Sequence, residues 1–222
     1  MYIEFSFPID TQKPIHSENI KPPQVIARTR FDNGDKSNTS YLEMYAHTGT
    51  HIDSPWHFNN RGWRINDFEI GQFVFEKVIA INIAKGPWQP LELKELQPYL
   101  EDIQQADALL INTGFAARYR ESNPQLYLSA MPGLSVDVAQ ALAGFSTLRC
   151  VGIDSNSVEN LQKNRPLGYP VHHALLDRAE PMILLEDANL DALGNHTIKK
   201  MFLFPLRVSD LEASPVTAVA EI

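Results

Sequence analysis

Apolar residues in this chain fall into short runs separated by polar stretches, and the spacing within each run distinguishes strands from helices. Runs rich in β-branched and aromatic residues predict strands at residues 2–7, 41–47, 73–84, 108–112, 148–153, 182–186 and 200–208. Apolar residues at helical spacing predict helices at residues 90–102, 136–143 and 171–178, and a helical turn at residues 115–121. Ser135 is the expected N-cap of the helix at residues 136–143, and Gly144 its end.

Strands and helices alternate in the second half of the chain, which is typical of α/β proteins. The chain has 222 residues, of which 44% are hydrophobic and 21% charged, a composition that suits one folded domain, with two small domains as the alternative. We therefore expect one α/β domain spanning residues 1–222. The polar segment at residues 8–39 is long for an unstructured loop, so either residues 25–30 form a strand or the segment covers a functional site.

Charge and hydropathy exclude several classes of partner. The formal net charge is −8 and no run of lysine and arginine occurs, so we expect no nucleic acid partner. Residues 1–10 lack the features of a signal peptide, and no stretch reaches the ~18 apolar residues of a membrane span, so we expect no membrane partner and a cytoplasmic location. The single cysteine, Cys150, lies in an apolar strand and is expected in the core rather than as a nucleophile.

Three histidines and an aspartate lie close together at residues 47–57, in the order His-Thr-Gly-Thr-His-Ile-Asp-Ser-Pro-Trp-His. In an extended backbone, alternation places His47, His51 and Asp53 on one side. Pro55 interrupts a regular strand, so His57 is expected to arrive by a loop. The alternative is a helix with His47 and His51 one turn apart, which is less favoured because the residues between them are poor helix formers.

Imidazole and carboxylate groups together are typical ligands of zinc, and also of manganese or iron. Such an ion with one open coordination position lowers the pKa of bound water toward ~7 and supplies hydroxide at neutral pH. A histidine that is not a ligand can then move protons, because its ordinary pKa is ~6.5. Surface or packing histidines are the alternative interpretation, which we adopt for His16 and His196 because their surroundings are polar.

The pattern His-x-Gly-Thr-His-x-Asp-x-Pro-x-His-Phe is complete at residues 47–58 and resembles that of the cyclase-like metal-dependent hydrolases, which include bacterial kynurenine formamidase (arylformamidase) and isatin hydrolase. Further segments resemble the same family in order. They are Leu-Leu-Ile-Asn-Thr-Gly at residues 109–114, Pro-Gly-Leu at 132–134, Gly-Ile-Asp-Ser-Asn-Ser at 152–157, and the block from His172 to Glu186. The resemblance spans residues 41–190 and implies a mixed sheet or barrel-like β core flanked by helices, of the swivelling β/β/α type.

The resemblance also implies a divalent metal centre of one or two ions, with Zn²⁺ expected and Mn²⁺ as the alternative. His47, His51 and Asp53 would bind one ion, and Asp53 could bridge to a second. His172 and Glu186 would bind that second ion, and His57 would be the proton shuttle or an additional ligand.

The gap from His172 to Glu186 is about two residues longer than is usual in the family. The extra residues lie in a turn, where added length is tolerated. His173 is the alternative to His172, and Glu180 and Asp187 are the alternatives to Glu186.

Other residues near these segments have two interpretations each. Asp154 either orients a ligand histidine or caps the next turn, and the role of Ser157 stays open. Trp56, Phe58 and Trp63 are expected in the core, with an aromatic wall of the substrate pocket as the alternative.

The expected reaction is hydrolysis of an amide by metal-bound hydroxide, with His57 as proton shuttle and N-formylkynurenine as the best single small-molecule substrate. The alternatives are opening of a cyclic amide such as isatin or of a lactone, and a metal-binding protein without turnover. A purely structural metal site is disfavoured because such sites are usually closed by Cys and His ligands. The resemblance implies a homodimer or homotetramer.

Overall fold

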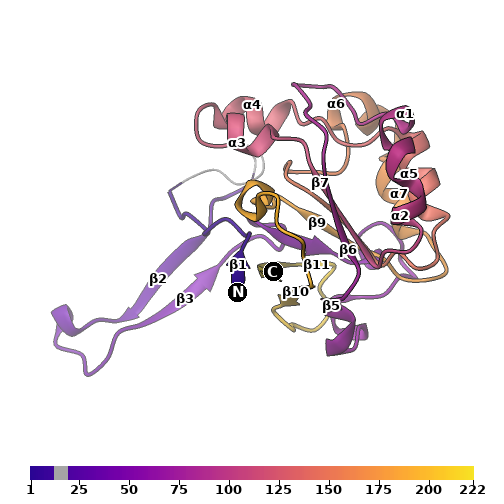
Figure 1. Ribbon diagram of the computed structural model, residues 1–222. Coiled ribbons are helices and arrows are strands. Elements are labelled where there is room, and N and C mark those ends of the chain that lie inside the picture. Colours follow the sequence, from indigo (N-terminus) through magenta and orange to yellow (C-terminus); the bar gives the residue numbers. More distant parts are fainter. Residues whose placement is uncertain (13–19) are drawn as a thin grey trace.

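A mixed β-sheet forms the centre of the structure, a computed structural model that describes residues 1–12 and 20–222 (Figure 1). His16 lies outside the described residues. The strands of the sheet are β1 (Tyr2–Glu4), β4 (His51–Asp53), β5 (Val74–Phe75), β6 (Val78–Asn82), β7 (Ala108–Asn112), β8 (Cys150–Ile153), β9 (Ile183–Glu186), β10 (Lys200–Pro205) and β11 (Ala213–Glu221). Their spatial order is β5-β10-β11-β4-β9-β8-β7-β6, and β1 pairs with β11.

One half of the sheet is parallel and layered with helices. Strands β6, β7, β8 and β9 run parallel to one another. The helices on their outer face are α1 (Leu93–Leu96), α2 (Leu100–Ile103), α5 (Val136–Ala143) and α7 (Pro170–Leu176) (Figure 1). Strand β7 is apolar and buried on both faces because helices cover one face and the rest of the sheet curves around the other.

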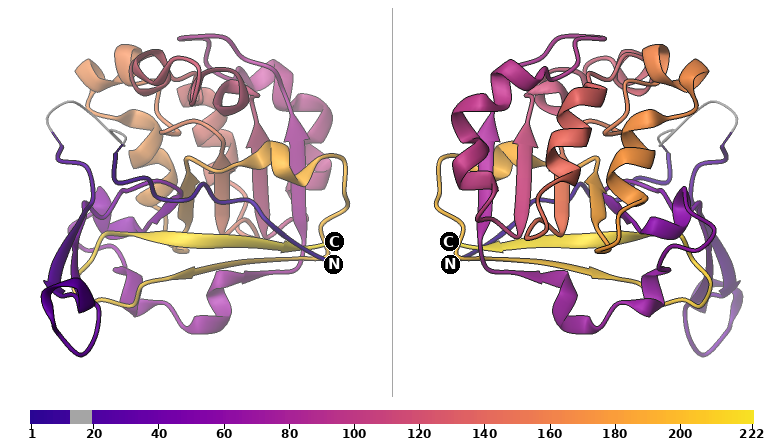
Figure 2. Two further views of the ribbon diagram at one scale, coloured as in Figure 1. Left: turned by 90° about the vertical axis from the view of Figure 1, so that its left-hand side faces the viewer. Right: turned by 90° about the vertical axis from the view of Figure 1, so that its right-hand side faces the viewer.

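The other half of the sheet is antiparallel and turns across the parallel strands, as Figure 2 shows for β10 and β11. This turn produces a nearly closed, barrel-like sheet whose interior holds an apolar cluster that includes Phe5, Phe73, Phe75, Met201 and Leu203. The two ends of the chain meet beside it, where the amino group of Met1 donates a hydrogen bond to the carbonyl of Ile222 at 3.2 Å. The structure confirms the expected α/β class with a barrel-like core.

A two-stranded ribbon projects from this body (Figure 1). It consists of β2 (Gln24–Thr29) and β3 (Thr39–Glu43), so the strand that we considered at residues 25–30 is present. Val25 pairs with Leu42 and Ile26 with Tyr41, and all of these side chains are exposed. The ribbon therefore carries apolar side chains on both of its faces.

Several predicted elements agree with the structure. The strand predicted at residues 108–112 coincides with β7, and the helix at residues 136–143 with α5. The Ser135 side chain accepts a hydrogen bond from the Val138 N–H, as an N-cap does.

Other predictions of elements were wrong, for local reasons. The continuous strand predicted at residues 73–84 is split into β5 and β6, because the N–H groups of Glu76 and Lys77 bind the carboxylate of Asp107 instead of a neighbouring strand. The helix at residues 90–102 is divided into α1 and α2 by a 3-10 turn at Gln97–Tyr99, which contains a proline. The strand predicted at residues 41–47 ends at Glu43, before the first histidine of the motif.

Three elements were not predicted at all, namely α4 (Pro124–Ser129), α6 (Leu161–Asn164) and β11. Strand β11 contains Pro215, which lacks a backbone donor and hides the strand pattern. The remaining helix, α3 (Phe115–Tyr119), lies within the helical turn predicted at residues 115–121. Among the described residues, no helix has the length and apolarity that crossing a bilayer requires.

Candidate metal centre

The pairing register of three adjacent strands brings the first acidic and imidazole groups together. Strand β4 lies between β9 and β11, with His51 directly opposite Glu186 and Asp53 opposite Ala213. Alternation along β4 turns His51 and Asp53 to the same face. Both side chains are fully buried, and Glu186 is the last residue of β9. The site therefore forms at the carboxyl end of a parallel strand, where open α/β sheets commonly bind ligands.

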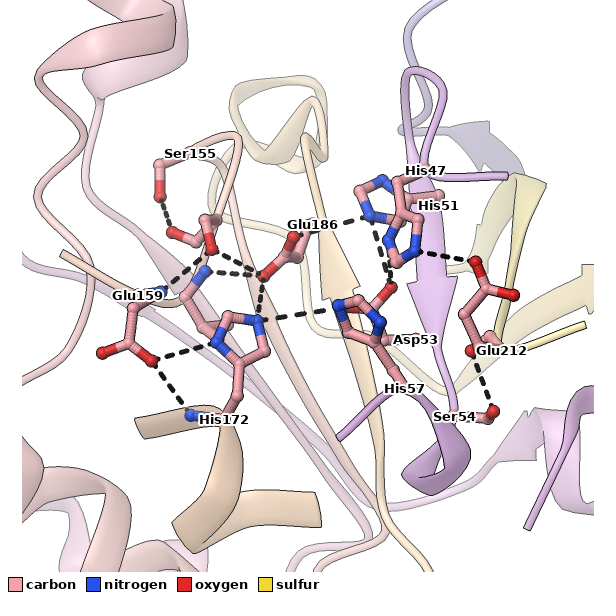
Figure 3. Close-up of polar contacts among 12 residues, drawn as sticks. His47, His51, Asp53, Ser54, His57, Ser155, Glu159, His172, Glu186 and Glu212 are labelled. Carbon is pink, nitrogen blue, oxygen red and sulfur yellow. Dashed lines mark hydrogen bonds and ion pairs between the residues drawn. The ribbon is translucent and has the colours of Figure 1, made fainter. Parts of the chain in front are cut away.

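His47 reaches the same place from the turn before β4. Its Nδ1 lies 2.8 Å from Asp53 Oδ1, and the Nε2 of His51 lies 3.4 Å from that same oxygen. Gly49 enables the turn because its φ is +62°, in the left-handed region. The Gly49 carbonyl accepts a hydrogen bond from His51 Nδ1 at 2.8 Å, which directs the other ring nitrogen toward the carboxylates. The imidazoles of residues 47 and 51 thus converge on Asp53 (Figure 3).

His57 enters from a 3-10 turn at Pro55–His57, in agreement with the expected loop. Its Nε2 lies 4.0 Å from Asp53 Oδ2, and its ring is 4.4 Å from the ring of His47 between centroids. The side chain is 24% exposed, whereas that of His47 is 3% exposed. Of the histidines in this group, His57 is therefore the most exposed.

His172 and Glu186 complete the group. The Nε2 of His172, on α7, lies 3.5 Å from Glu186 Oε1 and 4.0 Å from Asp53 Oδ2. His173 points away instead, and its half-exposed ring pairs with Asp177 at 2.8 Å. The structure thus brings His172 rather than His173 to the carboxylates.

The two acids that rivalled Glu186 lie elsewhere. Asp187 accepts two hydrogen bonds from the guanidinium of Arg120, at 2.9 and 3.0 Å, and a third from the hydroxyl of Tyr127 at 2.6 Å. Glu180 is exposed on the surface. Of the three acids, only Glu186 faces the imidazoles. The assignment of Glu186 and of these histidines as metal ligands stays a prediction.

The charges of the cluster compensate one another. Burial by itself would raise the pKa of Asp53, but His47 and His51 hold it well below its usual value. Burial and the charge of Asp53 would likewise raise the pKa of Glu186, but His172 and His51 lower it. Both carboxylates are therefore ionised at neutral pH, although both side chains are buried.

The residues present fit a divalent ion. One nitrogen or oxygen from each of His47, Asp53 and His57 lie within 4.8 Å of one another, and so do those of His51, Asp53 and Glu186. Neither oxygen of Asp53 receives a hydrogen bond of normal geometry from the described residues, although both are buried. Bare, buried carboxylate oxygens surrounded by imidazole nitrogens are suited to a shared cation. The predicted partition, with His47, His51 and Asp53 on one ion, stays a prediction.

Two acidic residues near the histidines were missed in the sequence. Glu159 Oε2 lies 3.0 Å from His172 Nδ1, and Glu212 Oε1 lies 3.3 Å from His47 Nε2. Neither residue belongs to a spaced motif. Glu212 precedes Ala213, which pairs with Asp53 across the sheet, so only the register of β4 and β11 reveals its role.

The structure gives Asp154 a role other than the two considered in the sequence. Its carboxylate accepts hydrogen bonds from Thr113 N–H, Thr113 Oγ1 and Ala116 N–H, and so caps the start of α3 rather than the turn that follows Asp154. Ser157 faces the cluster, and its hydroxyl donates to Glu186 Oε1 at 3.2 Å. Cys150 is fully buried, and burial raises the pKa of its thiol, as expected of a core cysteine.

A cavity of about 850 Å³ opens beside the cluster and is lined by His47, His57, His172 and Glu186. Its aromatic lining consists of Tyr45, Phe58, Trp88 and Tyr169. Phe58 stacks on the His172 ring, with centroids 4.6 Å apart. Of the three aromatic residues considered in the sequence, Phe58 lines the cavity. Trp56 instead lies under Arg64, and Trp63 packs on Phe68.

The family model described as a putative cyclase matches residues 3–160. The chain belongs to the cyclase family. Among the relatives of this chain, the kynurenine formamidase of Bacillus cereus is 30% identical over 182 residues, which cover 82% of this chain and 79% of the relative. The kynurenine formamidase of Bacillus cytotoxicus is 27% identical over 217 residues and covers 95% of each chain.

Solved structures share the fold of this chain. Isatin hydrolase A from Labrenzia aggregata superimposes with a TM-score of 0.83 and 19% identity, over 99% of this chain and 93% of that chain. An isatin hydrolase bound to the product analogue thioisatinate gives a TM-score of 0.82 and 17% identity, over 100% of this chain and 92% of that chain. At these identities the likeness shows the fold alone.

Metal binding to this protein should strengthen as pH rises. Burial would lower the pKa of His172, but Glu159 and Glu186 raise it to about 9, and the carboxylates raise the pKa of His47 and His51 as well. At neutral pH a cation must therefore displace protons, and its affinity should increase between pH 6.5 and 9 by up to about tenfold per pH unit for each proton displaced. Chelator competition at several pH values measures this.

The stability of the metal-free protein should change with pH in the opposite direction, which serves as a control. A histidine with a raised pKa stabilises the folded state fully below its ordinary value of 6.5, and this contribution is lost as pH rises toward about 9. The melting temperature without metal should therefore fall over that interval. A metal affinity that does not change with pH would contradict the assignment of these imidazoles as ligands.

Proposed function

We propose that this protein is a metal-dependent hydrolase that cleaves an amide, with N-formylkynurenine as its substrate. The observation that carries the proposal is the convergence of four histidines on two ionised, buried carboxylates beside a large cavity. The kynurenine formamidases among its relatives support the reaction class.

The proposal has five ligands for one or two divalent ions, namely His47, His51, Asp53, His172 and Glu186. Zinc is the first candidate ion and manganese the alternative. When bound, the metal activates water for attack and withdraws electrons from the amide carbonyl. The ionised carboxylates support this proposal because they supply the negative charge that a divalent cation requires.

His57 is the proposed proton shuttle. Burial lowers its pKa, and the neighbouring His47 and His172 oppose the protonated form further, so the ring is neutral at pH 7 and can accept a proton. Nε2 takes this proton from the attacking water as its oxygen bonds to the carbonyl carbon. The same nitrogen then returns the proton to the amide nitrogen as the C–N bond breaks, so a neutral aryl amine and formic acid leave, and the acid loses its remaining proton to solvent as formate.

The lining of the cavity supports the proposal of an aromatic substrate with a negatively charged group. Its aromatic lining suits a flat ring, and Arg165 is the one arginine or lysine among the described residues that line it. N-formylkynurenine combines an aryl formamide with a carboxylate that such an arginine would bind. Opening of isatin or of a lactone is the alternative, supported by the fold shared with isatin hydrolases. Metal binding without turnover is the second alternative.

Protein loaded with zinc or manganese should convert N-formylkynurenine to kynurenine. The absorbance band of the aryl amine product measures this conversion. Removal of metal by a chelator should abolish turnover, and metal addition should restore it. The His57→Ala variant should retain its metal and lose about 10²- to 10⁴-fold in kcat, because a positioned proton acceptor contributes that much. His173→Ala is the matched control, since His173 lies beside His172 but faces solvent.

Two outcomes would contradict this proposal. Full activity of His57→Ala would exclude its role as shuttle. If the metal-loaded protein hydrolyses neither a formamide, nor isatin, nor a lactone, the result would favour the alternative of a metal-binding protein without turnover.

Arg165→Ala separates the two candidate substrates. The KM for N-formylkynurenine should rise about fivefold with kcat unchanged, because an ion pair at this exposed position contributes up to about 1 kcal/mol to binding. The KM for isatin, which is uncharged, should not change. Lys163→Ala is the control, since Lys163 lies two residues before Arg165, in α6, but outside the cavity. Equal effects of both variants on both substrates would exclude recognition of the carboxylate by Arg165.

We further propose that the protein forms a homodimer or homotetramer. The ribbon of β2 and β3 supports this, since Val25 and Leu42 are 57% and 58% exposed and an isolated two-stranded ribbon is only marginally stable in water. Light scattering should give a mass of two or four times 25.0 kDa. A monomer mass at micromolar concentration would exclude it.

A further inference from the structure

Glu159 is a completely buried carboxylate on the far side of His172 from Asp53 (Figure 3). Its Oε2 accepts two hydrogen bonds from His172, one from the ring Nδ1–H at 3.0 Å and one from the backbone N–H at 3.1 Å. The other oxygen, Oε1, has no hydrogen-bond partner among the described residues. Within the described chain, the Glu159 carboxylate thus hydrogen-bonds to one residue only.

This contact selects the tautomer of His172. With Nδ1 donating to Glu159, the lone pair of the ring lies on Nε2, which is the nitrogen turned toward Glu186 and Asp53. A carboxylate behind a ligand histidine fixes the plane of the ring and makes its other nitrogen a stronger donor to a metal. The second bond, to the backbone N–H, holds the first turn of α7 and thereby the Cα from which the ring projects.

Glu159 is itself held by the loop that supports Glu186. The Ser157 hydroxyl accepts a hydrogen bond from the Glu159 N–H at 3.1 Å and donates to Glu186 Oε1 at 3.2 Å. The N–H of Val158, between them, donates to the same Glu186 oxygen at 2.8 Å. One short segment therefore orients both the carboxylate in front of the His172 ring and the carboxylate behind it.

The turn at Gly133 packs onto this segment from outside. Its φ is +62°, and a Cβ there would lie 2.5 Å from the backbone carbon of Glu159. Leu134, the next residue, forms a β-bridge with Glu159. The backbone of Glu159 consequently has little freedom to move away from His172.

The other histidines have different partners on the ring nitrogen that lies opposite the carboxylates of Asp53 and Glu186. The ring Nδ1 of His51 donates to the neutral carbonyl of Gly49. His47 faces Glu212 at 3.3 Å, and the Glu212 side chain is 29% exposed, so solvent weakens that contact. Of these three partners, Glu159 is the carboxylate that is completely buried.

We propose that Glu159 is a positioning residue of the metal centre, which presents His172 Nε2 to the ion shared with Glu186 and Asp53. This inference rests on the proposed metal centre but not on the proposed substrate. In this proposal Glu159 strengthens metal binding and makes no direct contact with the substrate.

The test compares Glu159→Gln, which keeps an oxygen acceptor but removes the charge, with Glu159→Ala and with the surface control Glu180→Gln. Zn²⁺ affinity is measured by chelator competition, and the absorption spectrum of the Co²⁺-loaded protein reports the ligand geometry. Glu159→Gln should bind Zn²⁺ about 10- to 100-fold more weakly and alter the Co²⁺ spectrum. Glu180→Gln should match the wild type in both measurements.

The melting temperature of the metal-free proteins separates positioning from simple support of the fold. At about pH 10, where the His172 ring is neutral and its raised pKa no longer contributes to stability, Glu159→Gln should melt close to the wild type without metal, because its amide oxygen can still accept the two bonds from His172. Wild-type Zn²⁺ affinity and an unchanged Co²⁺ spectrum in Glu159→Gln would overturn the inference, even if Glu159→Ala failed to fold. Wild-type protein that binds metal but hydrolyses no substrate would overturn the proposed function and leave this comparison valid.

Discussion

The buried pair of carboxylates at Asp53 and Glu186 is the constraint on which the rest of the site depends. Ionised carboxylates in the interior are strongly unfavourable unless positive charge lies beside them. In the metal-free protein the surrounding imidazoles supply that charge by taking up protons, and their pKa values are raised accordingly. A divalent cation supplies the same compensation, so protons and metal compete for one set of atoms.

The fold creates this pair by joining two kinds of sheet at one seam. The parallel half ends its strand β9 at Glu186, and the antiparallel half contributes β4 with His51 and Asp53. A shift of the β4–β9 register by one residue would turn His51 and Asp53 to the opposite face and dissolve the cluster. The apolar cores on the two sides of the sheet fix the register, since Ile52 is completely buried between those residues.

The histidines differ in how firmly they are held, and this difference matches their proposed roles. His47, His51 and His172 each place one ring nitrogen against an oxygen acceptor, namely Glu212, the Gly49 carbonyl and Glu159. Among the described hydrogen bonds, none involves the ring of His57, which is also the most exposed of the four. Clamped rings suit metal ligands, whose geometry must not change, and a less constrained ring suits a group that moves protons.

The sequence by itself determined the α/β class, the bounds of β7 and α5, and a dense group of potential ligands at residues 47–57, because these properties depend on local periodicity and spacing. It also selected His172 and Glu186, which the structure brings to Asp53, through a family pattern rather than through any local signal. Only the tertiary structure decided the rest. The partners Glu159 and Glu212, the placement of Asp187 away from the cluster, and the cap formed by Asp154 arise from strand pairing and loop packing between residues far apart in the chain. Such contacts leave no period or spacing in the sequence, so no inspection of the chain could find them.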